Sequence, residues 1–127
     1  MRSSRTVLTE HELEIMHVVW QHPSVTVRDV YEELLQHRKI AYTSVMTMMG
    51  ILERKGYLQK KKGDRAYLYR PTHPKSRVLR SLVNDFVGRV FNGSAKPLLV
   101  HLLENEQLSE QELDEIAGLM QERRNQP

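Results

Sequence analysis

The sequence predicts a mainly α-helical protein that carries one small β hairpin. Three helix starts share a capping signature, in which a hydroxyl residue is followed three positions later by an acid; these residues are Thr9, Thr26 and Ser109. Residues 57–70 read as two strands around a turn that contains Gly63. Helices followed by such a hairpin predict a winged helix-turn-helix domain, and the helical pattern beyond the hairpin predicts a second, helical domain.

Apolar staples and chain breakers set the expected bounds of the first three helices. The first follows Thr9 and ends near Gln21, because the next residue precedes a proline and so disfavours helical backbone. The second covers about 27–37, and the third covers about 43–55 and ends at Gly56, which suits the left-handed position after a helix. We expect the inward face of the first helix to carry Leu13, Met16, His17 and Trp20.

A proline-rich segment at 71–74 marks the predicted domain boundary. Two prolines in four residues cannot lie inside a helix or a central strand. We therefore divide the chain into a winged-helix domain at 1–72 and a helical domain at 73–127. In the second domain, helices are expected at about 75–91, 97–103 and 110–122.

The expected helix at 75–91 has apolar residues around most of its circumference. They cover an arc of roughly 220°, whereas a helix packed on one side needs little more than about 100°. Three short helices cannot enclose that surface alone, so the second domain is predicted to form a homodimer. The predicted dimerisation residues are Leu79, Leu82, Val83, Phe86, Val90, Leu99, Leu102, Leu113, Ile116 and Met120.

Charge is sorted along the chain. The segment from Arg38 to Arg80 holds twelve Lys or Arg and two acids, although the net charge of all 127 residues is only +3. The segments on either side are both net negative. A solvated surface does not require such sorting, and a concentrated basic block indicates a surface that binds a polyanion.

The third expected helix divides into an apolar and a polar side. With Val45 placed at 0°, Met49 falls at roughly 40°, whereas Gly50, Arg54 and Thr47 fall at roughly 140°, 180° and 200°. Short hydroxyl side chains and a bare glycine suit a helix that enters the major groove of DNA, although an ordinary surface helix shares the pattern. Together with the basic hairpin, this predicts the following DNA-binding residues: Arg38, Lys39, Tyr42, Thr43, Ser44, Thr47, Gly50, Arg54, Lys60, Lys61, Lys62 and Arg65.

The basic residues of the hairpin cluster near its turn. Lysines can simply protect an exposed strand edge, but the cluster exceeds what that protection requires and is expected to contact phosphates or a minor groove. Tyr67 and Tyr69 are expected to pack under the sheet rather than to stack on bases. The alternative to DNA binding is a winged helix that binds an acidic protein or RNA.

Catalytic patterns are incomplete, so we expect no enzyme. The segment starting at His11-Glu12 begins like a zinc-binding helix, but Ile15 stands where the second metal-binding histidine is required. No phosphate-binding glycine loop and no cysteine occur. We therefore expect no metal and no cofactor. No stretch approaches the roughly 20 apolar residues that span a membrane, so a soluble, cytoplasmic protein without a membrane partner is expected.

Several ordered blocks resemble one known family. The blocks are Leu8-Thr9-Glu10-His11-Glu12-Leu13, Thr26-Val27-Arg28-Asp29-Val30, Ala41-Tyr42-Thr43-Ser44-Val45, Leu52-Glu53-Arg54-Lys55-Gly56 and Arg65-Ala66-Tyr67-Leu68-Tyr69. In this order they resemble the BlaI/MecI penicillinase-repressor family. The resemblance implies a homodimeric winged-helix repressor of transcription that binds an inverted-repeat operator in double-stranded DNA.

The resemblance also bears on how the repressor is released. In the β-lactam branch of that family, a membrane sensor protease triggers cleavage at an Asn-Phe pair, whereas this chain has His101-Leu102 at the matching place. The copper-responsive branch carries Cys-x-Cys motifs, and this chain has no cysteine. The sequence therefore leaves open whether release comes by a sensor protease, by a ligand or another inducing partner, or not at all.

Overall fold

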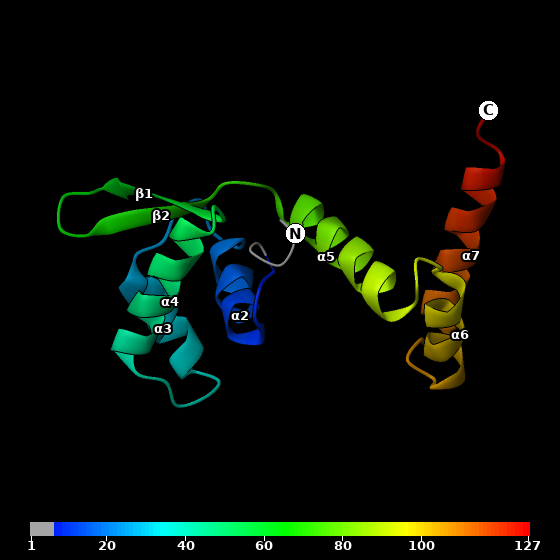
Figure 1. Cartoon of the computed structure of the whole chain (residues 1–127), viewed down its shortest axis with the longest axis horizontal. Helices are drawn as coiled ribbons and strands as arrows, with labels where there is room; N and C mark the ends of the chain where they lie inside the picture. Colours follow the sequence, from blue (N-terminus) through cyan, green and yellow to red (C-terminus); the bar gives the residue numbers. More distant parts are fainter. Residues whose placement is uncertain (1–6) are drawn as a thin grey trace. The chain divides into compact units, whose positions relative to one another are not determined.

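A computed structural model describes residues 7–127. Its helices are α2 (Glu10–Val19), α3 (Val27–Leu35), α4 (Tyr42–Arg54), α5 (Lys75–Val90), α6 (Lys96–Glu104) and α7 (Glu110–Arg124), and its strands are β1 (Leu58–Lys62) and β2 (Tyr67–Pro71) (Figure 1). The expected mainly helical fold with a two-stranded hairpin is confirmed.

The three predicted capping boxes are all present. At α2 the Glu12 amide donates to Thr9 Oγ1 at 3.1 Å, and the Thr9 amide donates to Glu12 Oε1 at 3.0 Å. Thr26 with Asp29 begins α3 in the same way, and Ser109 with Glu112 begins α7. Each box satisfies amides that a helix start leaves without a partner in the helix, which is why the sequence located these starts well.

The end of α4 is fixed by a glycine. Gly56 has φ +91°, and its amide donates to the carbonyl of Glu53 at 3.0 Å. The amide of Tyr57 donates to the carbonyl of Leu52, also at 3.0 Å. This pair of bonds is the Schellman arrangement, in which glycine accepts the left-handed backbone without steric cost, and it leads the chain directly into β1.

The core of the winged helix lies between α2, α3, α4 and the hairpin. The residues that are fully buried at its centre are Ile15, Met16, Val19, Val25, Val30, Leu34, Val45, Met49 and Leu52. On α2 the expected inward face was partly wrong: His17 is exposed, whereas Ile15 and Val19 are buried. The buried stripe of α2 runs through Glu12, Ile15, Met16 and Val19, which have the three- and four-residue spacing of one helix face.

The hairpin is joined to the helices by a third extended segment. β1 and β2 pair antiparallel, with Leu58 opposite Pro71 and Lys62 opposite Tyr67. Val25 forms a bridge with Tyr69 through two backbone hydrogen bonds of 2.9 and 2.7 Å. Tyr69 is buried as expected, but Tyr67 is 49% exposed, so the expectation that it packs under the sheet was wrong. Tyr67 lies two residues before the bridge, toward the turn of the hairpin, and it lines a surface hollow together with residues of α3 and α4.

The chain divides into two compact units, Met1–Leu82 and Val83–Pro127. The division falls within α5, whereas the sequence placed the boundary after residue 72. Val78 on the first half of α5 is buried in the winged-helix core, and Leu82 packs against that core. Leu82 was expected at a dimer contact, yet this packing already covers part of its side chain.

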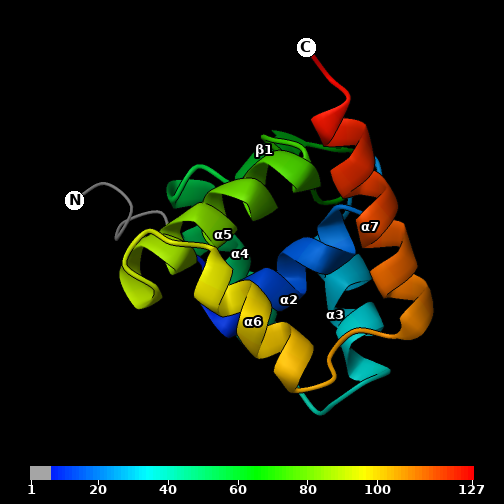
Figure 2. The ribbon, with the colours of Figure 1, turned by 90° about the vertical axis from the view of Figure 1, so that its right-hand side faces the viewer.

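The second unit has no buried residue anywhere in 83–127. α6 and α7 run in opposite directions from their connecting loop (Figure 2). The large apolar side chains that remain exposed are Val83, Phe86, Val90, Leu99, Val100, Leu103, Leu113, Leu119 and Met120. Among the described residues, no helix is long and apolar enough to cross a membrane.

Candidate nucleic-acid interface

α4 presents one packed side and one open side, as its sequence predicted. Val45, Met49 and Leu52 are fully buried. Thr43, Ser44, Thr47 and Arg54 are exposed, and Gly50 is half-buried. The open side therefore offers hydroxyls, one cation and bare backbone, which are groups that can reach base edges and phosphates.

A surface hollow of about 630 Å³ borders this open side. It is lined by His11 from α2, by Arg38 and Lys39 from the connector, and by Thr43, Ser44 and Thr47 from α4. Lys39 is exposed, and it has no ion-pair partner among residues 7–127. The hollow thus combines cationic and hydroxyl groups on neighbouring elements, which suits an anion such as a phosphate.

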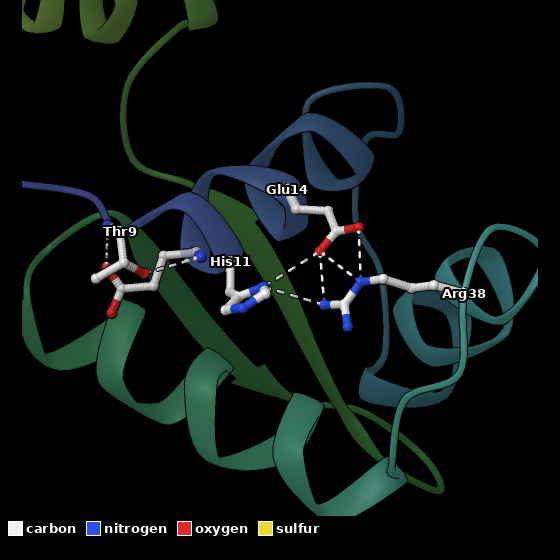
Figure 3. A network of polar contacts seen from close by, with 5 residues as sticks. Thr9, His11, Glu14 and Arg38 are labelled. Atoms are coloured by element: carbon white, nitrogen blue, oxygen red, sulfur yellow. Dashed lines mark hydrogen bonds and ion pairs between the residues drawn. The ribbon is translucent and has the colours of Figure 1, made fainter.

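Arg38 is bound by an acid of its own chain, Glu14. Its Nη2 donates to Glu14 Oε1 at 2.8 Å, and its Nε lies 3.2 Å from both Glu14 oxygens. Figure 3 shows Glu14 and His11 from α2 facing Arg38, whose Nη2 is 3.2 Å from His11 Nδ1. The Arg38 guanidinium holds the pKa of Glu14 below its ordinary value. Arg38 was expected among the DNA-binding residues, and this ion pair means that it also fastens the connector to α2.

Lys55, another cation of the basic block, is also used inside the fold. Its Nζ donates to Glu12 Oε1 at 2.8 Å and to the carbonyl of Val7 at 2.9 Å. Burial raises the pKa of Glu12, but hydrogen bonds from Lys55 and from the Thr9 amide outweigh it, so the net pKa lies below its ordinary value. Glu12, which resembled part of a zinc-binding helix, is therefore a structural residue.

The hairpin forms a basic wing, which we define as residues 58–71. Its turn is closed by the Gly63 amide, which donates to the carbonyl of Ala66 at 3.0 Å. A Cβ at Gly63 would lie 2.5 Å from the Ala66 oxygen, so only glycine fits this turn without a shift of the backbone. Lys61, Lys62 and Arg65 are exposed, and none has an ion-pair partner within residues 7–127. The cations at the turn therefore remain available to a polyanion.

A second hollow, of about 690 Å³, lies on the wing side of α4. It is lined by Val27, Arg28, Tyr42, Met46, Gly50 and Tyr67, among others. Lys60 Nζ lies 4.4 Å from the centre of the Tyr67 ring and 3.8 Å from Glu53 Oε1. Sequence reasoning did not select Met46 or Tyr67 for the site. The position of Met46, roughly 100° from Val45 on the helical wheel, was the available signal.

An exposed polar helix beside a basic hairpin defines a winged-helix DNA-binding protein. The family model described as "Penicillinase repressor" matches residues 8–122, and the chain belongs to this family. The sequence-based resemblance to the BlaI/MecI family is thereby confirmed, and with it the function of a transcriptional repressor.

Individual relatives agree with this assignment. The penicillinase repressor of Bacillus licheniformis is 30% identical over 118 residues, which cover 93% of this chain and 92% of that protein. The transcriptional regulator BlaI of Mycobacterium tuberculosis is 34% identical over 101 residues, which cover 78% of this chain and 73% of that protein. The solution structure of the DNA-binding domain of the repressor BlaI aligns with a TM-score of 0.50 and 32% identity, over 54% of this chain and 84% of that domain.

Proposed function

We propose that this repressor acts as a homodimer whose two winged helices bind the half-sites of an inverted-repeat operator in double-stranded DNA. The observation that carries the proposal is that one chain has two exposed surfaces of the kind that partners bind. One is the open side of α4 with the unpaired cations of the wing, and the other is the unburied apolar surface of 83–127.

The DNA contacts are assigned by the chemistry of each side chain. Tyr42, Thr43, Ser44, Thr47 and Gly50 lie at the start and along the open side of α4 and face base edges in the major groove. The cations Lys39, Arg54, Lys60, Lys61, Lys62 and Arg65 contact phosphates. Arg38 borders the 630 Å³ hollow beside α4, but it is also paired with Glu14. We therefore expect it to contribute less to DNA affinity than an arginine without an ion-pair partner.

The apolar side chains of 83–127 form the dimer contact. Val83, Phe86, Val90, Leu99, Leu113 and Met120 are exposed in one chain, and Leu102 and Ile116 are half-buried. Large contiguous apolar surfaces are rare on monomeric proteins, and a second copy of the same surface is a suitable cover. An inducing partner, whether a sensor protease or a ligand, would release the repressor by weakening this contact.

Two-fold symmetry determines the form of the operator. Two recognition helices related by a two-fold axis lie about one helical turn of DNA apart, roughly 34 Å, or a multiple of it. The operator is therefore a near-palindrome. Each winged helix alone binds weakly, and the dimer raises affinity through the effective concentration of the second half-site.

The proposal is tested by Phe86→Glu, with Leu35→Glu as the matched control. Both side chains are exposed to a similar extent, 43% and 42%, but Phe86 lies in 83–127 and Leu35 lies at the end of α3. We expect Phe86→Glu to give monomers in sedimentation experiments and to weaken operator binding by 100-fold or more in gel shifts, a factor in the range that linkage of two sites provides. Leu35→Glu should remain a dimer.

The operator itself is obtained by selecting duplexes that the full chain binds. A common inverted repeat, preferred over random duplex by about 1,000-fold or more, is the expected result. A wild-type chain that is monomeric at micromolar concentration would contradict the dimer. Equal affinity for selected and random duplex would instead support a winged helix that binds an acidic protein or RNA.

A further inference from the structure

Met46 is an exposed apolar side chain on the helix that is proposed to read DNA. It is 47% exposed, whereas its neighbours Val45 and Met49 are fully buried and carry the packing of α4. The fold therefore does not need an apolar residue at position 46. Helix formation does not need one either, because many polar residues have similar helix propensity.

The surroundings of Met46 indicate what it contacts. It lines the wing-side hollow with Tyr42 and Gly50 from its own helix and with Tyr67 from the wing. A Cβ at Gly50 would have only Arg54 Nη1 within 4 Å, at 3.8 Å, so the space one turn beyond Met46 is open. Arg28, Asp29 and Lys60 also line the hollow, so its charged groups are of both signs. What Met46 adds to these groups is a contact for an apolar group of the occupant.

Duplex DNA has one such group in its major groove, the 5-methyl group of thymine. The other base edges in that groove present hydrogen-bond donors and acceptors, which a methionine side chain does not satisfy. We propose that Met46 is a specificity-determining residue that recognises a thymine methyl group in each operator half-site. This inference rests on the proposed function, since it requires that α4 enter the major groove.

A deoxyuridine scan of the operator tests the proposal, because uracil pairs like thymine and lacks only the methyl group. Each thymine of the selected operator is replaced in turn, symmetrically in both half-sites, and affinity is measured with the full chain. Burying one methyl group is worth about fourfold in affinity. For the wild type, we expect a loss of about fourfold per half-site at one thymine position, or roughly 16-fold for the symmetric replacement.

The decisive comparison is between this loss in the wild type and in Met46→Ala. We expect Met46→Ala to bind the thymine operator more weakly and to lose the deoxyuridine effect at the same position, as two partners of one contact do in a double-mutant cycle. Met46→Leu, which stays apolar, should retain most of the effect. Leu35→Ala removes an exposed apolar residue that lines neither hollow and should leave the scan unchanged.

Three results would overturn the inference. The wild-type scan could be flat at every thymine, the loss could persist undiminished in Met46→Ala, or Leu35→Ala could abolish it equally. In all three cases the operator is still preferred over random duplex, so the proposed function stands. A failure of the proposed function is recognised differently, because the full chain would then prefer no duplex over another. Melting curves of Met46→Ala check the fold, which should be unaffected because the side chain is exposed.

Discussion

At the scale of single residues, Gly50 lies at a position where helix stability favours alanine and the proposed DNA binding favours glycine. Glycine in the middle of a helix costs about 0.5–1 kcal/mol relative to alanine. At Gly50 that cost has no steric reason, because an added Cβ would touch only the side chain of Arg54. The open side of α4 therefore keeps bare backbone at a position where the fold would accept alanine.

Gly50→Ala should stabilise the protein and weaken its binding to DNA. We expect the free energy of unfolding to rise by about 0.5–1 kcal/mol, and operator affinity to fall because the methyl group keeps the groove wall away. Thermal melts and gel shifts measure the two effects. Gly118→Ala on α7 is the control for helix stabilisation, since a Cβ there meets nothing within 4 Å. Unchanged operator affinity in Gly50→Ala would remove the residue from the interface.

Glu12 illustrates an ion pair that stabilises the winged helix. Its side chain is almost fully buried and accepts from both Lys55 and the Thr9 amide. Glu12→Gln removes the charge opposite a partly buried lysine, and we expect unfolding at neutral pH to become easier by about 2–3 kcal/mol. Denaturant titrations measure this loss. Glu10→Gln changes an exposed acid of the same first helical turn and should have a far smaller effect.

The pH dependence of that difference follows from the direction of the pKa shift. The pKa of Glu12 in the folded state lies below its ordinary value of 4.5. The stabilisation is therefore complete above the unfolded pKa and is lost as pH falls through the lower, folded pKa. The stability difference between wild type and Glu12→Gln should shrink below about pH 4.5. A difference that stayed constant into that acidic range would contradict the role given to the charge.

At the scale of elements, we expect the wing to contribute charge to DNA binding but no sequence preference. Arg65 is exposed at the turn and has no ion-pair partner within residues 7–127. Arg65→Ala should weaken binding to selected and random duplexes alike and reduce the slope of log affinity against log salt by about one unit, as expected for one lost phosphate contact. Affinities measured over a range of salt concentrations give the slope.

A matched control for the wing is Arg123→Ala, which removes an exposed arginine from the end of α7. Its slope should equal that of the wild type, because residue 123 lies outside the winged helix. A slope for Arg65→Ala that is unchanged would place the wing turn away from the DNA backbone.

The elements show where sequence reasoning succeeded and where it could not. Helix starts at Thr9, Thr26 and Ser109 were predicted correctly because capping is a local interaction between residues three apart. The bridge between Glu14 and Arg38 joins residues 24 apart and depends on how α2 meets the connector. No local pattern encodes such a contact, so the sequence predicted Arg38 as a DNA-binding residue without its ion pair to Glu14. The exposed position of Tyr67 was missed for a similar reason, since strand alternation does not say where the helical cover ends.

At the scale of the whole molecule, the two compact units differ in how they bury apolar surface. Met1–Leu82 contains the core described above, whereas nothing in 83–127 is buried. Short helices are marginal in water without tertiary packing, and α6 has 9 residues and α7 has 15. In the proposed homodimer the second copy supplies this packing, so we expect the folding of the second unit to be coupled to its association.

This coupling predicts two transitions with different concentration dependence. Circular dichroism reports all helices, whereas fluorescence from Trp20, the single tryptophan, reports the winged helix. On dilution we expect the helix signal of the second unit to melt at lower temperature, because mass action governs a dimer, while the Trp20 transition stays in place. Helicity that is independent of concentration over a hundredfold range would instead indicate that 83–127 folds as a monomer.

The sequence predicted two domains but not the place where they divide. The prolines at 71 and 74 suggested a linker, yet the first half of α5 returns to the winged helix and inserts Val78 into its core. The Val78 contact is long-range, and the apolar arc of α5 does not distinguish residues that face the core from those left for a partner. Structure was needed to assign Leu82 to the first group.

The steric limit at Gly63 also determines which residues of the turn can be replaced. The path of the chain at the turn is fixed by the absence of a side chain at one position, whereas Asp64 and Arg65 beside it are exposed. Single substitutions of Asp64 or Arg65 can therefore change the charge at the turn without changing the shape of the loop. Such substitutions would change the charge that the wing offers to DNA while the turn keeps its shape.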